Sequence, residues 1–349
     1  MENDRLLLVG SIPFDSTKEV FDAFGRTLSP WLRAMPDGET GPRKHWISRV
    51  HYQVLALHPD LEVLRQPAKE DGVERLAPRG AQDSWLFRVR PGVERVRFGD
   101  PGWRLGFARE ALASYHLMNA QKAQGNLPAH LRLQVSIPSV NSSIPRRVFE
   151  SVEDMHKVVE GYTEALRDEV RMIVSKIPAG ELALQWDCAN EIQEVYGAVA
   201  DLGKDQAIER NLPQFRVLNA LLPEEVLLGY HFCFGTLGGW PRFVPGDLGQ
   251  AVALANAVIG SSGRRVDWVH IPVLDRAEEA FVAPLAGLEA RGARIYLGVV
   301  HNMERFEHRV ALARKYLPEF GMGGYCGFGR LSPSELPGIL DEHRLAART

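Results

Sequence analysis

A histidine and a cysteine stand two residues apart in the segment GYHFCFG, as His231 and Cys233. The apolar residues that precede them predict the end of a β-strand. Side chains at alternate positions of a strand point to the same face, so an imidazole and a thiol would lie side by side. Such a pair could bind a metal ion. Both residue types are also common in protein cores, so the pair by itself leaves packing and metal binding open.

A third candidate ligand comes from the far end of the chain. The protein has three cysteines, at positions 188, 233 and 326, and each falls at or near the end of a predicted strand. Cys326 belongs to GGYCGFG (323–329), the last predicted strand. Two thiolates and one imidazole suit Zn²⁺, and three protein ligands leave one position for a substrate. We therefore predict that His231, Cys233 and Cys326 form a catalytic rather than a structural zinc site.

These residues need a scaffold that brings strand ends together, and the hydrophobic pattern predicts one. Short runs rich in Val, Ile and Leu alternate with longer amphipathic segments, which is typical of parallel strands joined by helices. The eight apolar runs are residues 5–11, 31–37, 131–138, 181–187, 225–233, 266–272, 294–301 and 323–329. Helices are predicted at residues 151–177, 247–263, 303–321 and 332–346. Eight such units predict an α/β protein with a closed (β/α)₈ TIM barrel, and an open doubly wound sheet is the alternative.

Residues 59–104 break this alternation. They contain two alternating apolar runs on either side of Pro91-Gly92, which predicts a β-hairpin with its turn at these two residues. We interpret the region as an insertion after the second strand. Because no linker separates the remaining segments, we predict one barrel domain over residues 1–349, with the insertion at about 59–104.

Reactive side chains gather at one face of this predicted barrel. The active sites of TIM barrels lie at the carboxyl ends of the strands. The residues that fall there are Ser11, Asp37, Glu39, Asp187, Cys188, His231, Cys233, His270, His301 and Cys326. All three cysteines are in this set, which favours a functional site over scattered core packing.

The overall composition excludes several classes of partner. A formal net charge of −3 gives no electrostatic basis for binding nucleic acid. No apolar run approaches the roughly 20 residues that span a bilayer, and the N-terminal residues lack a signal-peptide pattern. An odd, low number of cysteines indicates a reducing compartment. We therefore expect a cytoplasmic protein that acts on small molecules, with its oligomeric state left open.

Four short segments resemble the catalytic barrel of cobalamin-independent methionine synthase. That family belongs to a superfamily with uroporphyrinogen decarboxylase and the zinc-dependent thiol methyltransferases. VGSIP (9–13) resembles its opening IGSFPR strand, and DGE (37–39) resembles its HGE segment. LQWD (184–187) resembles its IQIDEPA strand, and HFC (231–233) with the distant Cys326 resembles its zinc ligands. Each match is short, but their order and their placement on predicted strands agree.

The resemblance implies roles for particular residues. His231, Cys233 and Cys326 match zinc ligands. Ser11, Glu39 and Asp187 match positions that hold the amino-acid part of homocysteine, where carboxylates would face the ammonium group. A structural role is the alternative, with Ser11 capping a turn and Asp187 orienting a neighbour.

The chain also departs from the family pattern. The segment WVHIP has Pro272 where the family has a glutamate that ligates zinc. His270 stands two residues earlier on the same face, so either it replaces that glutamate as a fourth ligand or the site has three protein ligands. His301 stands where the family has an aspartate, and DCAN replaces DEPA after the fourth strand.

We therefore predict a zinc-dependent methyl- or alkyltransferase that activates the thiol of a small substrate. Asp187 and His301 are the catalytic candidates, and His301 or His270 could move a proton to the leaving group. Two alternatives remain: a zinc-dependent lyase or hydrolase acting on an ether, thioether or carboxylate, and a non-catalytic protein that binds an amino acid or a methyl carrier. Arg146 and Arg147, in PSVNSSIPRR, either meet an anionic group or lie on the solvated surface.

Overall fold

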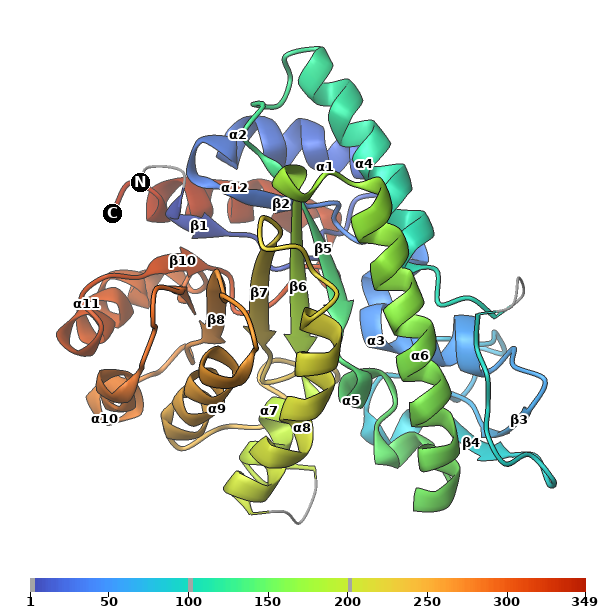
Figure 1. Ribbon diagram of the computed structural model, residues 1–349. Coiled ribbons are helices and arrows are strands. Elements are labelled where there is room, and N and C mark those ends of the chain that lie inside the picture. Colours follow the sequence, from blue (N-terminus) through green and yellow to red (C-terminus); the bar gives the residue numbers. More distant parts are fainter. Residues whose placement is uncertain (1–3, 100–102, 200–202) are drawn as a thin grey trace.

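A curved sheet of parallel strands dominates the computed structural model, which describes residues 4–99, 103–199 and 203–349 (Figure 1). Within these residues the sheet has eight strands: β1 (Leu6–Leu7), β2 (Ala34–Pro36), β5 (Arg132–Pro138), β6 (Leu182–Cys188), β7 (Leu227–Phe232), β8 (Trp268–Pro272), β9 (Arg294–Gly298) and β10 (Gly321–Gly323). Their spatial order is β1-β10-β9-β8-β7-β6-β5-β2. A parallel bridge between Leu6 and Leu32 brings the two edges together. The sheet is thus a nearly closed barrel, which confirms the predicted fold.

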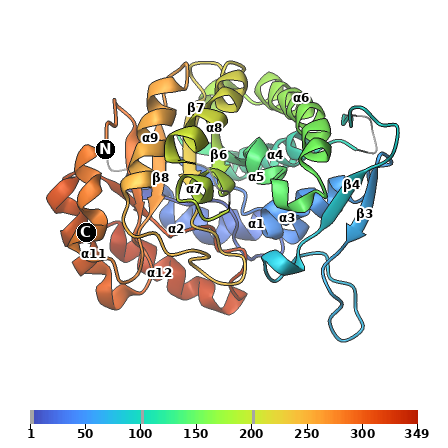
Figure 2. The same cartoon turned by 90° about the horizontal axis from the view of Figure 1, so that it is seen from below.

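Helices surround the strands (Figure 2). The longer ones are α4 (Phe107–Ala123), α6 (Val152–Lys176), α8 (Lys204–Asn219), α9 (Gly249–Ser261), α11 (Phe306–Tyr316) and α12 (Leu336–Ala346). The shorter ones are α1 (Thr17–Val20), α2 (Arg26–Leu28), α3 (Trp46–Val50), α5 (Val140–Ser143), α7 (Asn190–Val195) and α10 (Glu279–Val282). The four predicted helices are confirmed. Ser151 caps α6, because its hydroxyl accepts a hydrogen bond from the Asp154 backbone N–H at 2.9 Å. None of the helices in the described ranges is long and apolar enough to cross a bilayer.

Apolar side chains fill the interior of the barrel below the carboxyl ends of the strands. This separate cluster consists of Leu7, Ala34, Ala183, Leu227, Trp268 and Tyr296. Trp268 is the register partner of Gly229 on the neighbouring strand. A Cβ atom at Gly229 would lie 1.9 Å from Cε2 of the indole, so glycine leaves the space that the indole occupies. The barrel is therefore a packed core at this level.

The strand register aligns reactive residues one level above this core. Asp187 on β6 pairs with His231 on β7, and His231 pairs with His270 on β8. Residues in register on adjacent strands point to the same side of a sheet. The two histidines lie two positions beyond Gly229 and Trp268, so the apolar cluster forms the floor beneath them.

The predicted insertion contains a β-hairpin, but its turn differs from the prediction. β3 (Leu61–Arg65) pairs antiparallel with β4 (Leu86–Val89) at the edge of the molecule beside α3 and α6 (Figure 1). Residues 66–85 connect these strands, so the prediction that Pro91-Gly92 forms the turn is wrong. The run after Pro91-Gly92 packs on α6 instead, where the backbone N–H of the buried Val96 donates to the carbonyl of Lys157 at 3.0 Å. Residues 100–102 of the predicted insertion lie outside the described residues.

The last strand is shorter than predicted, which changes where Cys326 sits. β10 ends at Gly323, so Cys326 lies in the loop that follows and not in the strand. This loop turns toward Ser11, since the N–H of Phe328 donates to the Ser11 carbonyl at 2.6 Å. The backbone N–H of Gly329 donates to the Ser11 hydroxyl at 3.2 Å. Pairing with the segment after β1 replaces continuation of the strand.

Replacing Gly229 with alanine should disturb the floor of the site. The added methyl group collides with the indole of Trp268, so we expect Gly229→Ala to lower the free energy of unfolding by about 1–3 kcal/mol in urea titrations. Gly180→Ala is the matched control, because a Cβ atom at Gly180 meets nothing within 4 Å. Equal stability of the two variants would show that the indole does not need this space.

Candidate metal centre

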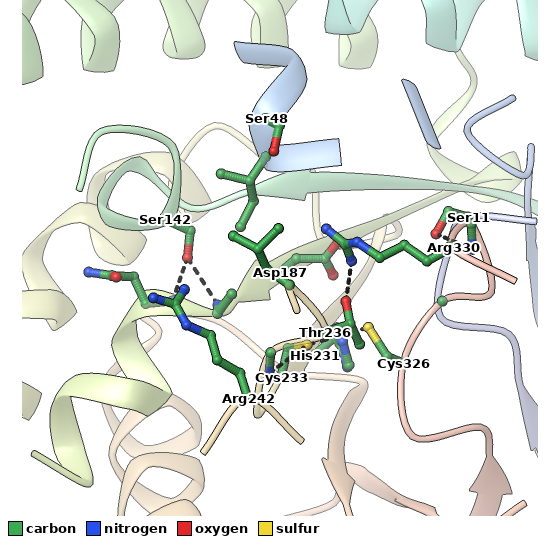
Figure 3. Close-up of a pocket in the computed structure, with 18 of the residues that line it drawn as sticks. Ser11, Ser48, Ser142, Asp187, His231, Cys233, Thr236, Arg242, Cys326 and Arg330 are labelled. Carbon is green, nitrogen blue, oxygen red and sulfur yellow. Dashed lines mark hydrogen bonds between the residues drawn. The ribbon is translucent and has the colours of Figure 1, made fainter. Parts of the chain in front are cut away.

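Three predicted ligands converge at the carboxyl ends of β7 and β10 (Figure 3). A ring nitrogen of His231 and the sulfur atoms of Cys233 and Cys326 lie within 4.8 Å of one another. The two sulfur atoms are 3.3 Å apart, and both cysteines are free thiols. His231 and Cys233 are buried, whereas Cys326 is half-buried and borders a cavity. The structure thus brings together residues that are up to 95 positions apart in the sequence.

Hydrogen bonds determine which nitrogen of His231 is free. Nε2 of His270 lies 3.0 Å from the carbonyl oxygen of Gly324, which can only accept, so this nitrogen carries the proton. Nδ1 of His270 therefore accepts a hydrogen bond from Nδ1 of His231, at 2.8 Å. Nε2 of His231 then has no proton, and it is buried without a hydrogen-bond partner among the described residues. An unprotonated imidazole nitrogen without a hydrogen-bond partner is available to bind a metal ion.

Burial keeps both imidazoles neutral, which this arrangement requires. It lowers the pKa of His231 well below its ordinary value, and the neighbouring His270 lowers it further. Burial also lowers the pKa of His270 to about 3, against a smaller opposite effect of the Gly324 carbonyl. Both ring nitrogens of His270 are engaged in hydrogen bonds, and His270 does not belong to the group of three candidate metal ligands. Its geometry favours the orientation of His231 over direct ligation.

The two thiols share one hydrogen bond and differ in acidity. That bond lowers the pKa of Cys233, with help from the Gly235 backbone N–H and the charge of Arg330, while burial opposes the shift. The same bond and burial raise the pKa of Cys326 well above its ordinary value. Arg330 was not among the predicted residues, although its position four residues after Cys326 was a signal that could have suggested it.

The loop that carries Cys326 needs glycine to reach this position. A Cβ atom at Gly327 would lie 2.5 Å from the Ser11 hydroxyl oxygen, and one at Gly329 would lie 2.8 Å from it. Only glycine lets the loop approach Ser11 so closely. The predicted Ser11 therefore lies beside the metal ligands and helps to hold one of them in place.

Two buried carboxyl groups, those of Glu39 and Asp187, border the same cavity. Burial raises the pKa of Glu39 well above its ordinary value, and Asp37 adds to this. Burial also raises the pKa of Asp187 well above its ordinary value, and the charge of Glu39 adds to this. In the described ranges no basic side chain lies within 4.0 Å of either carboxyl group. Such a pair suits an incoming cation, an ammonium group above all.

A tight turn aims Glu39 into the cavity. Gly38 and Glu39 have φ angles of 81° and 48°, in the left-handed region that ordinary residues avoid. The carboxylate of Asp37 holds this turn by accepting hydrogen bonds from the Glu39 backbone N–H at 2.8 Å and from Arg43 at 2.7 Å. Asp37 thus stabilises the turn without lining the cavity, whereas Glu39 does line it.

The cavity has a volume of about 100 Å³. The predicted site residues that line it are Ser11, Glu39, Asp187, His231, Cys233 and Cys326, and its basic lining residues are Lys44, Arg147, Arg242 and Arg330. The four basic residues were not predicted as a group, because they come from four separate segments that only the fold brings together.

Two further predicted residues do not reach this cavity. Nε2 of His301 donates to the Val273 carbonyl at 2.9 Å, and its ring packs against Trp240 and Tyr325. Burial lowers the pKa of His301 to about 4. Cys188 is buried in the core, with its thiol 3.8 Å from the Trp186 carbonyl. The structure therefore gives both residues packing contacts, and proton transfer by His301 stays a prediction.

Comparison with known proteins supports the fold. The chain is similar to a B12-independent methionine synthase from Shewanella sp. W3-18-1 whose structure was solved in complex with selenomethionine. The TM-score is 0.62, with 12% identity over 95% of this chain and 86% of that chain. It is also similar to a proposed vitamin-B12-independent methionine synthase from Listeria monocytogenes, with a TM-score of 0.51 and 14% identity over 100% of this chain and 97% of that chain. No family model matches the sequence, and no curated protein matches it. At these identities the similarity establishes a methionine synthase-like barrel.

The residues at this centre fit Zn²⁺. Two sulfur atoms and one unprotonated imidazole nitrogen form a donor set that this ion prefers, and the buried nitrogen has no other partner. We expect the purified protein to hold about one zinc ion per chain, and Cys233→Ser and Cys326→Ser to reduce this below about 0.2, as measured by plasma mass spectrometry.

Cys188→Ala serves as the control for these variants, because it removes the third thiol without touching the centre. Its zinc content should equal that of the unmodified protein. Equal zinc content in all four proteins would contradict a centre built on Cys233 and Cys326.

The buried carboxyl groups should make the protein less stable as the pH rises. A raised pKa means that the folded state retains a proton that the unfolded chain releases above the ordinary value of 4.5 for Glu39. The stabilising contribution of this proton is complete below that value and is lost as the pH rises toward the raised one. Glu39→Gln should therefore raise the urea midpoint at pH 8 and change it little at pH 4.5.

The exposed Glu319 provides the control, since Glu319→Gln removes an equal charge at the surface. A stability difference between Glu39→Gln and the unmodified protein that is constant from pH 4.5 to pH 8 would contradict the raised pKa.

Proposed function

We propose that the protein is a zinc-dependent transferase that moves a methyl or alkyl group onto the thiol of a small substrate. The observation that carries this proposal is the convergence of His231, Cys233 and Cys326 beside a cavity at the carboxyl ends of a methionine synthase-like barrel. Three protein ligands leave one position for a substrate, as in catalytic zinc sites. A structural site would have a fourth protein ligand and no adjoining cavity.

Bound zinc would lower the pKa of a substrate thiol, and so supply a strong sulfur nucleophile at neutral pH. The protein groups prepare this chemistry. The hydrogen bonds from His231 to His270 and from His270 to Gly324 hold the His231 ring in one tautomer and one orientation. In the transfer, the sulfur lone pair forms the new carbon–sulfur bond, while the bond between donor and carbon breaks and its electron pair stays with the departing donor.

The two carboxyl groups support a substrate that carries an amino group. An ammonium ion placed between Glu39 and Asp187 would favour their charged forms and reverse the effect of burial. Glu39 has an oxygen atom, Oε1, that is buried without a partner among the described residues. Asp187 Oδ1 already accepts from Gln185 at 2.7 Å, so its orientation is set before substrate arrives. We propose that these carboxyl groups bind the substrate ammonium group and that Asp187 accepts the thiol proton.

The activity can be tested with homocysteine or cysteine as acceptor and trimethylsulfonium as methyl donor. We expect the methyl thioether and dimethyl sulfide in equal amounts by mass spectrometry, and a rate at least about 100-fold lower for Cys326→Ser. Glu39→Gln should raise KM about tenfold for these amino thiols and leave it unchanged for propanethiol, which lacks the amino group.

The products distinguish transfer from the alternatives. Dimethyl sulfide accompanied by methanol, with no thiol consumed, would replace the transferase with a hydrolase. Binding of the amino thiol without turnover of this or any other sulfonium donor would instead indicate a binding protein.

A further inference from the structure

Two arginines at the cavity lack the acidic partner that a buried cation normally has. Arg147 follows α5, and Arg242 lies in the loop after β7. Within the described part of the chain, neither guanidinium group forms a salt bridge, because no carboxylate lies within 4.0 Å of it. Arg147 donates from one terminal nitrogen to Asn190 at 2.9 Å, and its Nε is buried without a partner. The side chain of Arg242 has no hydrogen bond to the described residues.

The two charges also disfavour each other. Burial lowers the pKa of Arg147 to about 10, and the nearby charge of Arg242 adds to this. Burial lowers the pKa of Arg242 in the same direction. Partly burying two like charges with no counterion costs free energy, and a structural role of the two arginines would not offset this cost. An anion placed between them would remove this cost.

A structural arginine in the same protein looks different. Arg309 is fully buried, and its guanidinium group donates to the carbonyls of Val299 at 3.0 Å and Asn302 at 3.1 Å. It also pairs with the carboxylate of Asp275 at 3.1 Å. The neighbour of Arg147 is different again, because Arg146 is exposed and donates to local backbone carbonyls. Arg167 and Arg294 also have a buried Nε without a partner and no salt bridge among the described residues, but neither of them lines the cavity. Arg147 and Arg242 therefore differ from the other unpaired arginines in their position at the cavity.

The guanidinium groups of these arginines lie away from Cys326. Arg242 extends toward Ser142, whereas Cys326 lies on the other side of the cavity, next to Thr236 and Arg330 (Figure 3). Arg147 reaches the same side as Arg242, because it donates to Asn190, whose backbone N–H donates to the Ser142 hydroxyl at 2.9 Å. The cavity thus has a thiol end, with Cys326 and Arg330, and an arginine end, with Arg147 and Arg242.

We propose that Arg147 and Arg242 form a subsite for an anionic group, a carboxylate, sulfonate or phosphate, on the molecule that occupies this cavity. Guanidinium groups match the geometry of such oxyanions with paired hydrogen bonds. The assignment of this anion to a substrate of the transfer reaction rests on the proposed function, but its binding does not. A molecule in the cavity would place its anionic group at the arginine end and its reacting group at the thiol end.

Calorimetric titration of the full-length, zinc-loaded protein with glutarate, methanesulfonate and inorganic phosphate tests the subsite. The three probes distinguish the chemical source of the anion, and glutaramide is the uncharged control for glutarate. We expect at least one anion to bind, and Arg147→Met and Arg242→Met each to weaken it about tenfold or more. Arg146→Met should leave the affinity unchanged, because this side chain lies outside the cavity lining.

Stability measurements keep the test decisive. Removal of an unpaired, partly buried charge should raise the Tm of Arg242→Met, whereas loss of a structural arginine would lower it. If Arg147→Met does not fold, Arg147→Lys keeps the charge, loses the planar fork and should still weaken binding. Equal affinity in all arginine variants, or no binding of any of the three anions, would overturn the proposal.

Cys326→Ser separates this inference from the proposed function. Anion binding that survives in this variant supports an independent subsite, even if the variant has lost its zinc and the protein proves to have no transferase activity. Anion binding that is lost in Cys326→Ser and kept in both arginine variants would place the anion at the metal and overturn the subsite.

Discussion

The hydrogen bond between the rings of His231 and His270 determines what the centre of this barrel can bind. Because burial keeps both rings neutral and the Gly324 carbonyl can only accept, the bond runs in one direction. It leaves Nε2 of His231 as a free base beside two thiols. The strand register that pairs His231 with His270, and the apolar cluster beneath them, keep the two rings in contact. The fold therefore holds His231 in the tautomer and orientation that metal binding requires.

The charges around the cavity follow the same logic of groups prepared in advance. Glu39 and Asp187 border the cavity without a cation, and Arg147 and Arg242 line it without an anion. Each pair costs stability in the free protein, because burial opposes the charged form of these groups and neither pair has a counterion. The Asp37 turn and the strand register nevertheless hold Glu39 and Asp187 in place. A bound molecule that carries both signs of charge would compensate both pairs.

The sequence was informative where a side chain's position follows from the strand pattern. The periodicity predicted the barrel, and the ends of its strands predicted that His231, Cys233 and Asp187 would meet. Features that depend on loops were not predictable. Cys326 was predicted in the last strand but reaches the centre from a loop that closes on Ser11, and the run after Pro91-Gly92 packs on α6 instead of forming a strand. The pairing of His270 with His231 and the meeting of the cavity arginines depend on contacts between distant segments, which local patterns do not encode.

The direction of the histidine hydrogen bond predicts which atoms would coordinate a bound metal ion. X-ray absorption spectroscopy of the zinc-loaded protein measures them directly. We expect two sulfur ligands, one imidazole and one light atom from solvent, in a four-coordinate site. Addition of a thiol substrate should raise the number of sulfur ligands to three. A spectrum with two imidazoles would show that His270 binds the metal, and a spectrum without sulfur would contradict the centre itself.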